Sequence, residues 1–92
     1  MSTFQKIYSI VAKIPKGKVL SYKQVAKLSN TTPRIVGFAL HANKDPKNIP
    51  CHRVIKDNGT LARGYAFGGE KRQRVKLKKE GIIFFKRQIV LI

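Results

Sequence analysis

Apolar and polar positions alternate in the first half of the chain with the spacing of amphipathic helices. In the segment 4–12 the apolar residues recur three and four positions apart, which predicts a helix with Ser2 or Thr3 as its N-cap. The composition of residues 15–18 is typical of a turn, and residues 19–20 are expected to form a short extended piece. The chain is therefore expected to open with one amphipathic helix that ends at a turn.

Two further helices are predicted close together. The first follows Ser21, because Ser21 and the glutamine three residues later match a capping box, and Leu28 is expected on its buried face. The second begins at Pro33 behind Thr32 as its N-cap and ends at about His41 or Asn43. Two short helices joined by a few polar residues are typical of a helix-turn-helix motif, a pattern that also occurs in proteins that never contact DNA.

The middle of the chain is expected to be less regular. Pro50 cannot donate to a strand ladder and keeps Ile49 out of the helical region, so Cys51 is expected in an irregular or extended stretch. Residues 57–59 have the composition of a tight turn, and residues 64–69 form a loop bracketed by glycines.

A last helix is predicted over about Glu70–Glu80, with Gly81 just past its end. Its apolar face is thin and consists of Val75 and Leu77. The apolar tail over residues 82–92 is expected to form a final strand, or a patch that another chain covers. These elements predict a mostly helical domain with short strands.

Composition narrows the class of partner. The chain has 92 residues, enough for one small domain, and at 42% hydrophobic it is not expected to be disordered. Lys and Arg number 20 against 4 acidic residues, and the formal net charge of +16 favours a polyanionic partner, nucleic acid first and an anionic membrane surface second. No apolar run approaches the roughly 20 residues that span a bilayer, and no signal peptide is recognisable. A cytoplasmic protein is therefore expected, associated with the nucleoid if the source is prokaryotic.

The single cysteine, Cys51, is followed by His52 and Arg53. One cysteine excludes an internal disulfide, and together with two histidines it supplies too few ligands for an ordinary structural zinc site. A nucleophilic thiolate needs positive charge or a base nearby, and this cationic chain supplies charge. A small buried apolar residue is the alternative role for Cys51. Adjacent side chains of an extended strand point to opposite sides, so Cys51 and His52 are expected to communicate through a water or a curved backbone.

The residues around Cys51 resemble a known family. Residues 49–55, Ile-Pro-Cys-His-Arg-Val-Ile, are similar to the active-site motif of the 6-O-alkylguanine-DNA alkyltransferases, which are suicide DNA repair proteins. Further segments resemble the family in the same order: residues 21–26 its Ser-Tyr stretch, residues 34–40 its Arg-x-Val-Gly-x-Ala recognition helix, Asn43 its asparagine before the cysteine, residues 64–65 its following loop, and residues 80–81 its final Glu-Gly. The resemblance extends from Phe4 to Gly81.

The resemblance implies a fold, a reaction and a partner. The fold is a winged-helix-like domain that contains the helix-turn-helix motif, and residues 1–92 are expected to be a single catalytic and DNA-binding domain without the N-terminal domain that most members carry. The implied partner is double-stranded DNA containing 6-O-alkylguanine, entered from the minor groove. The alkylated base is flipped out of the duplex, and its alkyl group is transferred irreversibly to the protein in a single turnover. No cofactor and no metal is implied.

The resemblance also assigns roles to residues of this chain. Cys51 accepts the alkyl group, His52 acts through a water as general base, and Glu80 orients the imidazole. Tyr22 donates to the base and helps to rotate it out, and Asn43 braces the turn that links the recognition helix to the cysteine. Arg34 fills the gap in the base stack, and the other DNA contacts are implied for Ser21, Tyr22, Thr32, Pro33, Gly37 and Arg53. The substrate pocket is implied for Pro50, Val54, Tyr65 and Ala66.

Two other functions compete with this one. Alkyltransferase-like proteins bind alkylguanine without chemistry and flag it for other repair pathways, but they replace the cysteine, commonly with tryptophan, whereas this chain keeps Cys51 with His52 and Glu80. A basic architectural or membrane-surface module accounts for the charge and leaves the residues around Cys51 unexplained. Lys76 departs from the family, which usually has leucine there. A monomer is expected, with a dimer through the apolar tail as the alternative.

Overall fold

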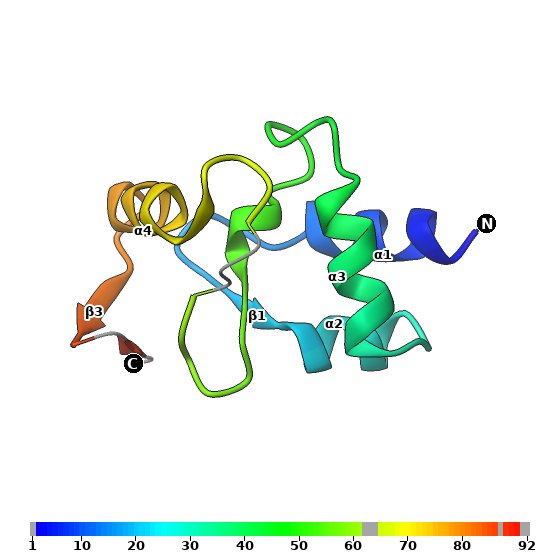
Figure 1. Cartoon of the computed structure of the whole chain (residues 1–92), viewed down its shortest axis with the longest axis horizontal. Helices are drawn as coiled ribbons and strands as arrows, with labels where there is room; N and C mark the ends of the chain where they lie inside the picture. The colour runs from blue at the N-terminus through cyan, green and yellow to red at the C-terminus, as the bar shows by residue number, and fades with distance from the viewer. Residues whose placement is uncertain (1, 62–64, 87, 91–92) are drawn as a thin grey trace.

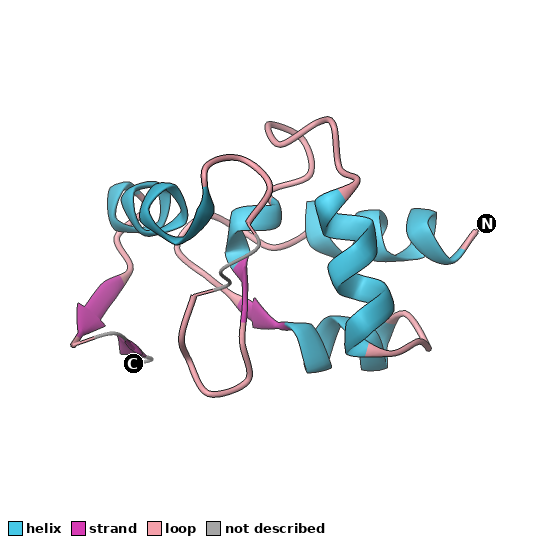
Figure 2. Cartoon of the chain, viewed as in Figure 1, coloured by secondary structure: helices cyan, strands magenta, loops and turns pink. Residues whose placement is uncertain are grey.

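Helices dominate the structure, a computed structural model that describes residues 2–61, 65–86 and 88–90 (Figures 1 and 2). Three helices gather at one end, and a fourth helix with a short hairpin occupies the other (Figure 1). Two strands of two residues each and one turn of 3₁₀ helix lie between these ends. The dimensions of 37 × 22 × 22 Å reflect this arrangement along one axis.

The predicted helix-turn-helix motif is confirmed. Helices α2 (Tyr22–Leu28) and α3 (Pro33–His41) pack against each other, and α1 (Thr3–Ala12) packs against both. Ser2 and Ser21 each form a capping box with the glutamine three residues later, and the Thr32 hydroxyl accepts from a backbone N–H of α3. The short polar side chains that the sequence places before each apolar stretch therefore fix where the three helices begin.

The buried residues form two clusters. The first joins α1, α2 and α3 to Cys51, Val54 and Tyr65, and the second lies between α4 and the hairpin. The expectation that Leu28 faces inward is wrong, because its side chain is 64% exposed at the end of α2. The buried face of α2 consists of Val25 and Ala26, and Ser29, just past the helix, continues it with its hydroxyl donating to Val25 O at 2.6 Å.

A two-stranded parallel ladder joins the helical end to the cysteine segment. Strand β1 (Leu20–Ser21) pairs with β2 (Val54–Ile55), with Leu20 opposite Val54. The expectation that Cys51 lies in an irregular or extended stretch is wrong, since Cys51–Arg53 form one turn of 3₁₀ helix immediately before β2. Backbone hydrogen bonds explain the difference: Cys51 N–H donates to Ile49 O at 2.7 Å across an inverse γ-turn at Pro50, and Arg53 N–H donates to Pro50 O at 2.9 Å.

Helix α4 (Gly69–Lys79) ends in a Schellman motif, with Glu80 as its C-cap. Gly81 adopts φ +92°, a left-handed conformation that favours glycine, and the N–H groups of Gly81 and Ile82 donate to the last carbonyls of the helix. Leu77 is fully buried as predicted, but Val75 is 46% exposed. Gln73 takes the buried place that the apolar pattern had suggested for Val75.

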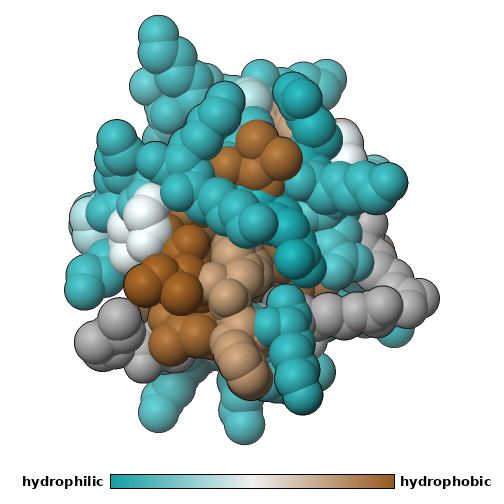
Figure 3. Space-filling view, turned by 90° about the vertical axis from the view of Figure 1, so that its left-hand side faces the viewer, coloured by the Kyte–Doolittle hydropathy of each residue, from teal (hydrophilic) through white to brown (hydrophobic). Residues whose placement is uncertain are grey.

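The apolar tail forms an antiparallel hairpin of β3 (Ile83–Phe85) and β4 (Gln88–Val90). Ile83 and Phe85 are 53% and 67% exposed. At the end of the molecule formed by α4 and the hairpin, Figure 3 shows an apolar area surrounded by hydrophilic side chains. The predicted turn at 57–59 is present, with Gly59 N–H donating to Lys56 O at 3.0 Å. Residue 64 of the predicted glycine loop, and residues 91–92 of the tail, lie outside the described residues.

Candidate active site

Cys51 lies at the junction of the helix-turn-helix and the parallel strands. Its residue is only 3% exposed and belongs to the first core cluster. Asn43, just beyond α3, holds the segment before it: its Nδ2 donates to Ile49 O at 2.9 Å, and its Oδ1 accepts from Asp45 N–H at 2.9 Å. The asparagine therefore braces the link between α3 and the cysteine turn.

Burial raises the pKa of the Cys51 thiol above its ordinary value. A side-chain hydrogen bond with Asn43, the positive charge of Lys76 and backbone N–H groups act in the opposite direction without cancelling the effect of burial. The cysteine therefore stays a thiol at neutral pH. A base has to remove its proton before it can act as a strong nucleophile.

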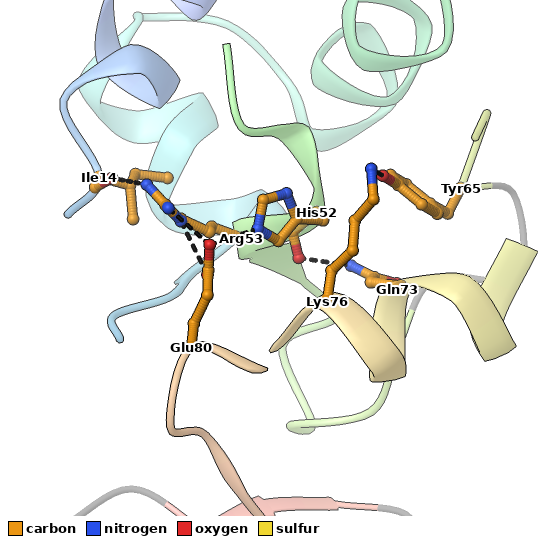
Figure 4. A network of polar contacts seen from close by, with 7 residues as sticks. All are labelled: Ile14, His52, Arg53, Tyr65, Gln73, Lys76 and Glu80. Carbon is orange, nitrogen blue, oxygen red and sulfur yellow. Dashed lines mark hydrogen bonds and ion pairs between the residues drawn. The ribbon is translucent and has the colours of Figure 1, made fainter. Parts of the chain in front are cut away.

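His52 and Glu80 are 28 residues apart in the sequence, and their side chains meet in the fold (Figure 4). Nε2 of His52, in the 3₁₀ turn, lies 3.0 Å from Oε2 of Glu80, the C-cap of α4. Because a carboxylate can only accept a hydrogen bond, Nε2 carries the proton and Nδ1 has the lone pair. Nδ1 is buried and has no hydrogen-bond partner among the described protein atoms.

Burial lowers the pKa of His52, and the attraction of Glu80 only partly offsets this effect. The imidazole is therefore neutral at physiological pH and is able to accept a proton at Nδ1. Burial alone would raise the pKa of Glu80, but its hydrogen bonds with Arg53 and His52 outweigh burial and hold the pKa below its ordinary value. The pair is thus a neutral imidazole oriented by a carboxylate.

Arg53 was expected to contact DNA, but its side chain is bonded within the protein. Its Nε and a terminal nitrogen donate to the two carboxylate oxygens of Glu80 at 3.0 and 2.6 Å, and its other terminal nitrogen donates to Ile14 O at 2.7 Å. The Arg53 side chain is only 16% exposed, so its guanidinium is used inside the protein. We therefore assign Arg53 to holding Glu80, which in turn orients His52.

Sequence reasoning missed Gln73. This residue is fully buried on α4, and its Nε2 donates to the carbonyls of His52 and Val54 at 2.9 and 3.0 Å (Figure 4). One amide thus fixes the turn that carries His52 to the strand that follows it. A polar residue inside a weak apolar pattern was the available signal, and it does not by itself reveal which backbone groups a glutamine will meet.

Three tyrosine side chains lie near enough to Cys51 for its thiolate, once formed, to raise their pKa values. Burial raises the pKa of Tyr22, Tyr8 and Tyr65, and the proximity of Cys51 adds to the effect in each case. Tyr22, the first residue of α2, was expected at the site, and Tyr65 belongs to the same core cluster as Cys51. Tyr8 was not expected; its hydroxyl donates to Ala39 O at 2.7 Å. All three tyrosines thus lie in, or pack against, the core cluster that contains Cys51.

The pocket residues inferred from the resemblance occupy two kinds of position. Pro50, Val54 and Tyr65 are buried around the cysteine turn, whereas Ala66 is exposed on the loop before α4. A cleft of about 370 Å³ opens beside them, lined in part by Pro50, His52 and Glu80. The buried residues and this cleft place the cysteine turn near the surface without exposing Cys51 itself.

Most residues expected to contact DNA lie at the start of the two motif helices, whereas Gly37 lies in the middle of α3 and Arg53 in the cysteine turn. Ser21 is the N-cap of α2, and Thr32 and Pro33 begin α3, where they are exposed. Arg34 is exposed in the first turn of α3, with its guanidinium carbon 5.6 Å from the ring centroid of Phe38, a phenylalanine that is itself 53% exposed. This edge therefore presents a cation and an aromatic ring to the solvent.

Within the described ranges no helix combines the length and apolar character that crossing a bilayer requires. The same residues bring together no group of three or more His, Cys, Asp or Glu side chains suited to a metal ion.

Comparison with known proteins identifies the family. The sequence model described as "6-O-methylguanine DNA methyltransferase, DNA binding domain" matches residues 2–82, which is most of the chain. The chain belongs to this family. A methylated-DNA–protein-cysteine methyltransferase of Saccharolobus islandicus is 47% identical over 76 residues, which are 83% of this chain and 48% of that relative. The chain thus spans about half the length of the curated relatives that it matches.

Solved structures of the family share the fold. Atl1 of S. pombe, in complex with damaged DNA containing O6-carboxymethylguanine, superimposes with a TM-score of 0.82 at 30% identity and covers 98% of this chain and 88% of its own. OGT of Mycobacterium tuberculosis, in complex with DNA, superimposes with a TM-score of 0.80 at 32% identity over 88% of this chain and 49% of its own. Both neighbours confirm the helix-turn-helix domain.

Proposed function

We propose that this protein repairs alkylguanine in DNA by transferring the 6-O-alkyl group to Cys51, once per molecule. The observation that carries the proposal is the arrangement of the turn: a buried thiol adjoins a neutral imidazole whose Nε2 is held by Glu80 at 3.0 Å and whose Nδ1 has no protein partner among the described residues. Side chains one position apart on a 3₁₀ helix point about 120° away from each other. The two side chains therefore do not hydrogen-bond to each other directly, and a water between them completes the proton relay.

The residues at the site and the alkylated base together account for each bond and proton of the reaction. Nδ1 of His52 takes the Cys51 proton through the water, and Sγ attacks the alkyl carbon in line with the bond to the guanine oxygen. The S–C bond forms, the C–O bond breaks, and its electron pair goes to guanine, which takes up one proton. The Tyr22 hydroxyl, held near Cys51, donates to the departing base. The products are guanine in DNA and a thioether on Cys51.

A duplex partner follows from the charge and from the exposed edge of the motif. A stacked base keeps its alkyl group out of reach of a buried thiol, so the nucleotide has to leave the stack. The net charge of +16 supplies phosphate contacts, and Arg34 in the first turn of α3 is free of acidic partners among the described residues. We infer that the motif enters the minor groove and that the planar Arg34 guanidinium fills the gap that the base leaves.

A lesion-binding protein without chemistry is the second candidate. The similarity to S. pombe Atl1 over nearly the whole of both chains favours it. The Cys51 thiol and the oriented His52–Glu80 pair favour transfer, because a pure binder has no need of a base beside a cysteine.

The experiment that separates the two candidate functions measures how much methylated guanine remains in the DNA. A duplex with one 6-O-methylguanine is mixed with increasing protein, digested to nucleosides, and its methylated and plain guanine are quantified. Alkyl transfer predicts that each protein molecule removes one methyl group and then stops. Tight binding with no loss of methylguanine at any protein concentration would leave the lesion-binding candidate.

Gly37 offers a further check on the DNA interface. A methyl group added to its Cα would meet no protein atom within 4 Å, so packing against another helix does not require glycine there. Gly37→Ala is expected to raise the free energy of unfolding by about 1 kcal/mol, because glycine is a poor helix former. If DNA approaches the α3 backbone closely, the same change weakens duplex binding. A variant that is more stable and binds equally well would contradict close approach at Gly37.

A further inference from the structure

Lys76 is the residue of α4 that departs from the apolar pattern of the family, and the structure gives it a defined position. Its Nζ donates to the Tyr65 hydroxyl at 2.8 Å and lies 5.4 Å from the Tyr65 ring centroid. It also lies 5.8 Å from the ring centroid of Phe67. One hydrogen bond and two aromatic faces thus hold the ammonium in place.

The held ammonium lies beside the turn that carries Cys51 and His52. In Figure 4 Lys76 extends from α4 to Tyr65 on the side of His52 away from Glu80. Its charge acts on Cys51, His52 and Tyr65, and it lines the same cleft as Pro50 and His52. Among the described residues it is the cation whose charge bears on the thiol.

The ammonium also retains capacity for a ligand. A lysine has three N–H donors, and the Tyr65 hydroxyl uses one of them. The described residues give Lys76 no carboxylate partner, since the ion pairs of this region join Glu80 to His52 and Arg53. A partly buried cation without an acidic partner attracts an anionic group more strongly than a fully solvated one does.

We propose that Lys76 is a specificity-determining residue of the alkyl site, and that it favours guanine adducts whose alkyl group ends in an anion, such as carboxymethyl, over neutral adducts. The inference rests on the proposed function, because it concerns which alkyl group Cys51 receives.

The physical reason is charge balance during transfer. The Cys51 thiolate attacks the methylene carbon, the S–C bond forms, and the C–O bond breaks with its electron pair going to guanine, which takes up one proton. For a carboxymethyl group this brings a carboxylate beside a thiolate in a partly buried site, where like charges repel strongly. The Lys76 ammonium offsets that repulsion, and a methyl group gains nothing comparable.

The test compares two duplexes in single-turnover reactions, one with 6-O-carboxymethylguanine and one with 6-O-methylguanine. The proteins are the unaltered chain, Lys76→Met, and Lys78→Met, which removes an exposed charge from the same helix. We expect the carboxymethyl-to-methyl rate ratio to fall about tenfold in Lys76→Met and to stay unchanged in Lys78→Met. Lys76→Arg, which keeps the charge, is expected to retain most of the ratio, and circular dichroism reports whether each variant is folded.

An unchanged ratio in folded Lys76→Met would overturn the proposal. If the unaltered chain transfers neither group, the proposed function fails, and the same variants are then compared with iodoacetate and iodoacetamide. These reagents differ in charge and not in the carbon attacked, and the chain has one cysteine, so intact mass reports on Cys51 alone. A loss of iodoacetate preference in Lys76→Met supports the role of Lys76, and an unchanged preference overturns it.

Discussion

Glu80→Gln is expected to lower both the stability of the protein and the rate of alkyl transfer. The carboxylate accepts two hydrogen bonds from Arg53 and one from His52, and its side chain is only 13% exposed. Neutralising it leaves a largely buried guanidinium without its counter-charge, which costs about 3 kcal/mol at pH 7. Urea unfolding measures the loss.

The pH dependence of the stability has a definite sign. Because the folded-state pKa of Glu80 is held below its ordinary value of about 4.5, its contribution is fully present above that pH and is lost as the pH falls through the folded value. The difference in stability between the unaltered chain and Glu80→Gln is therefore expected to be largest near neutral pH and to shrink below about pH 4. A difference that grows on acidification would contradict the ion pair.

The effect of Glu80→Gln on the rate of alkyl transfer distinguishes a role in orienting His52 from a role in stabilising the fold. Glutamine offers one acceptor oxygen where the carboxylate offers two, so Arg53 and His52 compete for it. The hydrogen bond that fixes the tautomer of His52 is weakened, and we expect transfer to slow by roughly 10²-fold at saturating DNA. The pH–rate profile is also expected to shift, because the Glu80 charge opposes the lowering of the His52 pKa. Glu70→Gln makes the same chemical change at the start of α4 and is the matched control. Equal rate losses in both variants would contradict a specific role for Glu80.

Arg34→Ala is expected to slow the repair of duplex DNA by roughly 10²-fold while leaving the reaction with free alkylated base nearly unchanged. The free base requires no extrusion from a stack, so only the duplex reaction needs a side chain that fills the gap. Arg34 is exposed at the start of α3, and its guanidinium lies over the ring of Phe38 in the same helix. The comparison of the two substrates is made by single-turnover kinetics.

Lys71→Ala is the control for lost charge, because Lys71 is an exposed cation on α4, at the other end of the molecule. It is expected to weaken duplex binding modestly through fewer phosphate contacts and to leave the rate at saturation unchanged. Loss of both the duplex and the free-base reactions in Arg34→Ala would instead indicate damage to the site, and equal losses in the two variants would reduce Arg34 to a phosphate contact.

Local signals predicted the helices of this protein well. Ser2, Ser21 and Thr32 cap the helices that the sequence assigned to them, because a cap depends on a side chain and a backbone group only three residues away. Leu28 and Val75 were placed wrongly, since periodicity shows which face a residue belongs to and not where the neighbouring elements stop covering that face.

The contacts that build the site join residues that lie far apart in the sequence. The Cys51 turn is helical because two backbone hydrogen bonds close around Pro50, a local geometry that the proline signal alone did not reveal. The contacts of Arg53 and Glu80 are separated by 27 residues, and those of Gln73 with His52 by 21. A resemblance to a family pointed to Cys51, His52 and Glu80, but only the folded chain shows that Arg53 and Gln73 hold them.

The central claim is that Cys51 itself receives the alkyl group, and intact-protein mass tests it most directly. The protein is incubated with an excess of duplex bearing one 6-O-methylguanine, then weighed and digested to locate any added mass. Alkyl transfer to Cys51 predicts a gain of one methylene unit, about 14 Da, on the peptide containing Cys51, and no gain in Cys51→Ala. An unchanged mass in protein that binds the lesion duplex more tightly than plain duplex would contradict the claim.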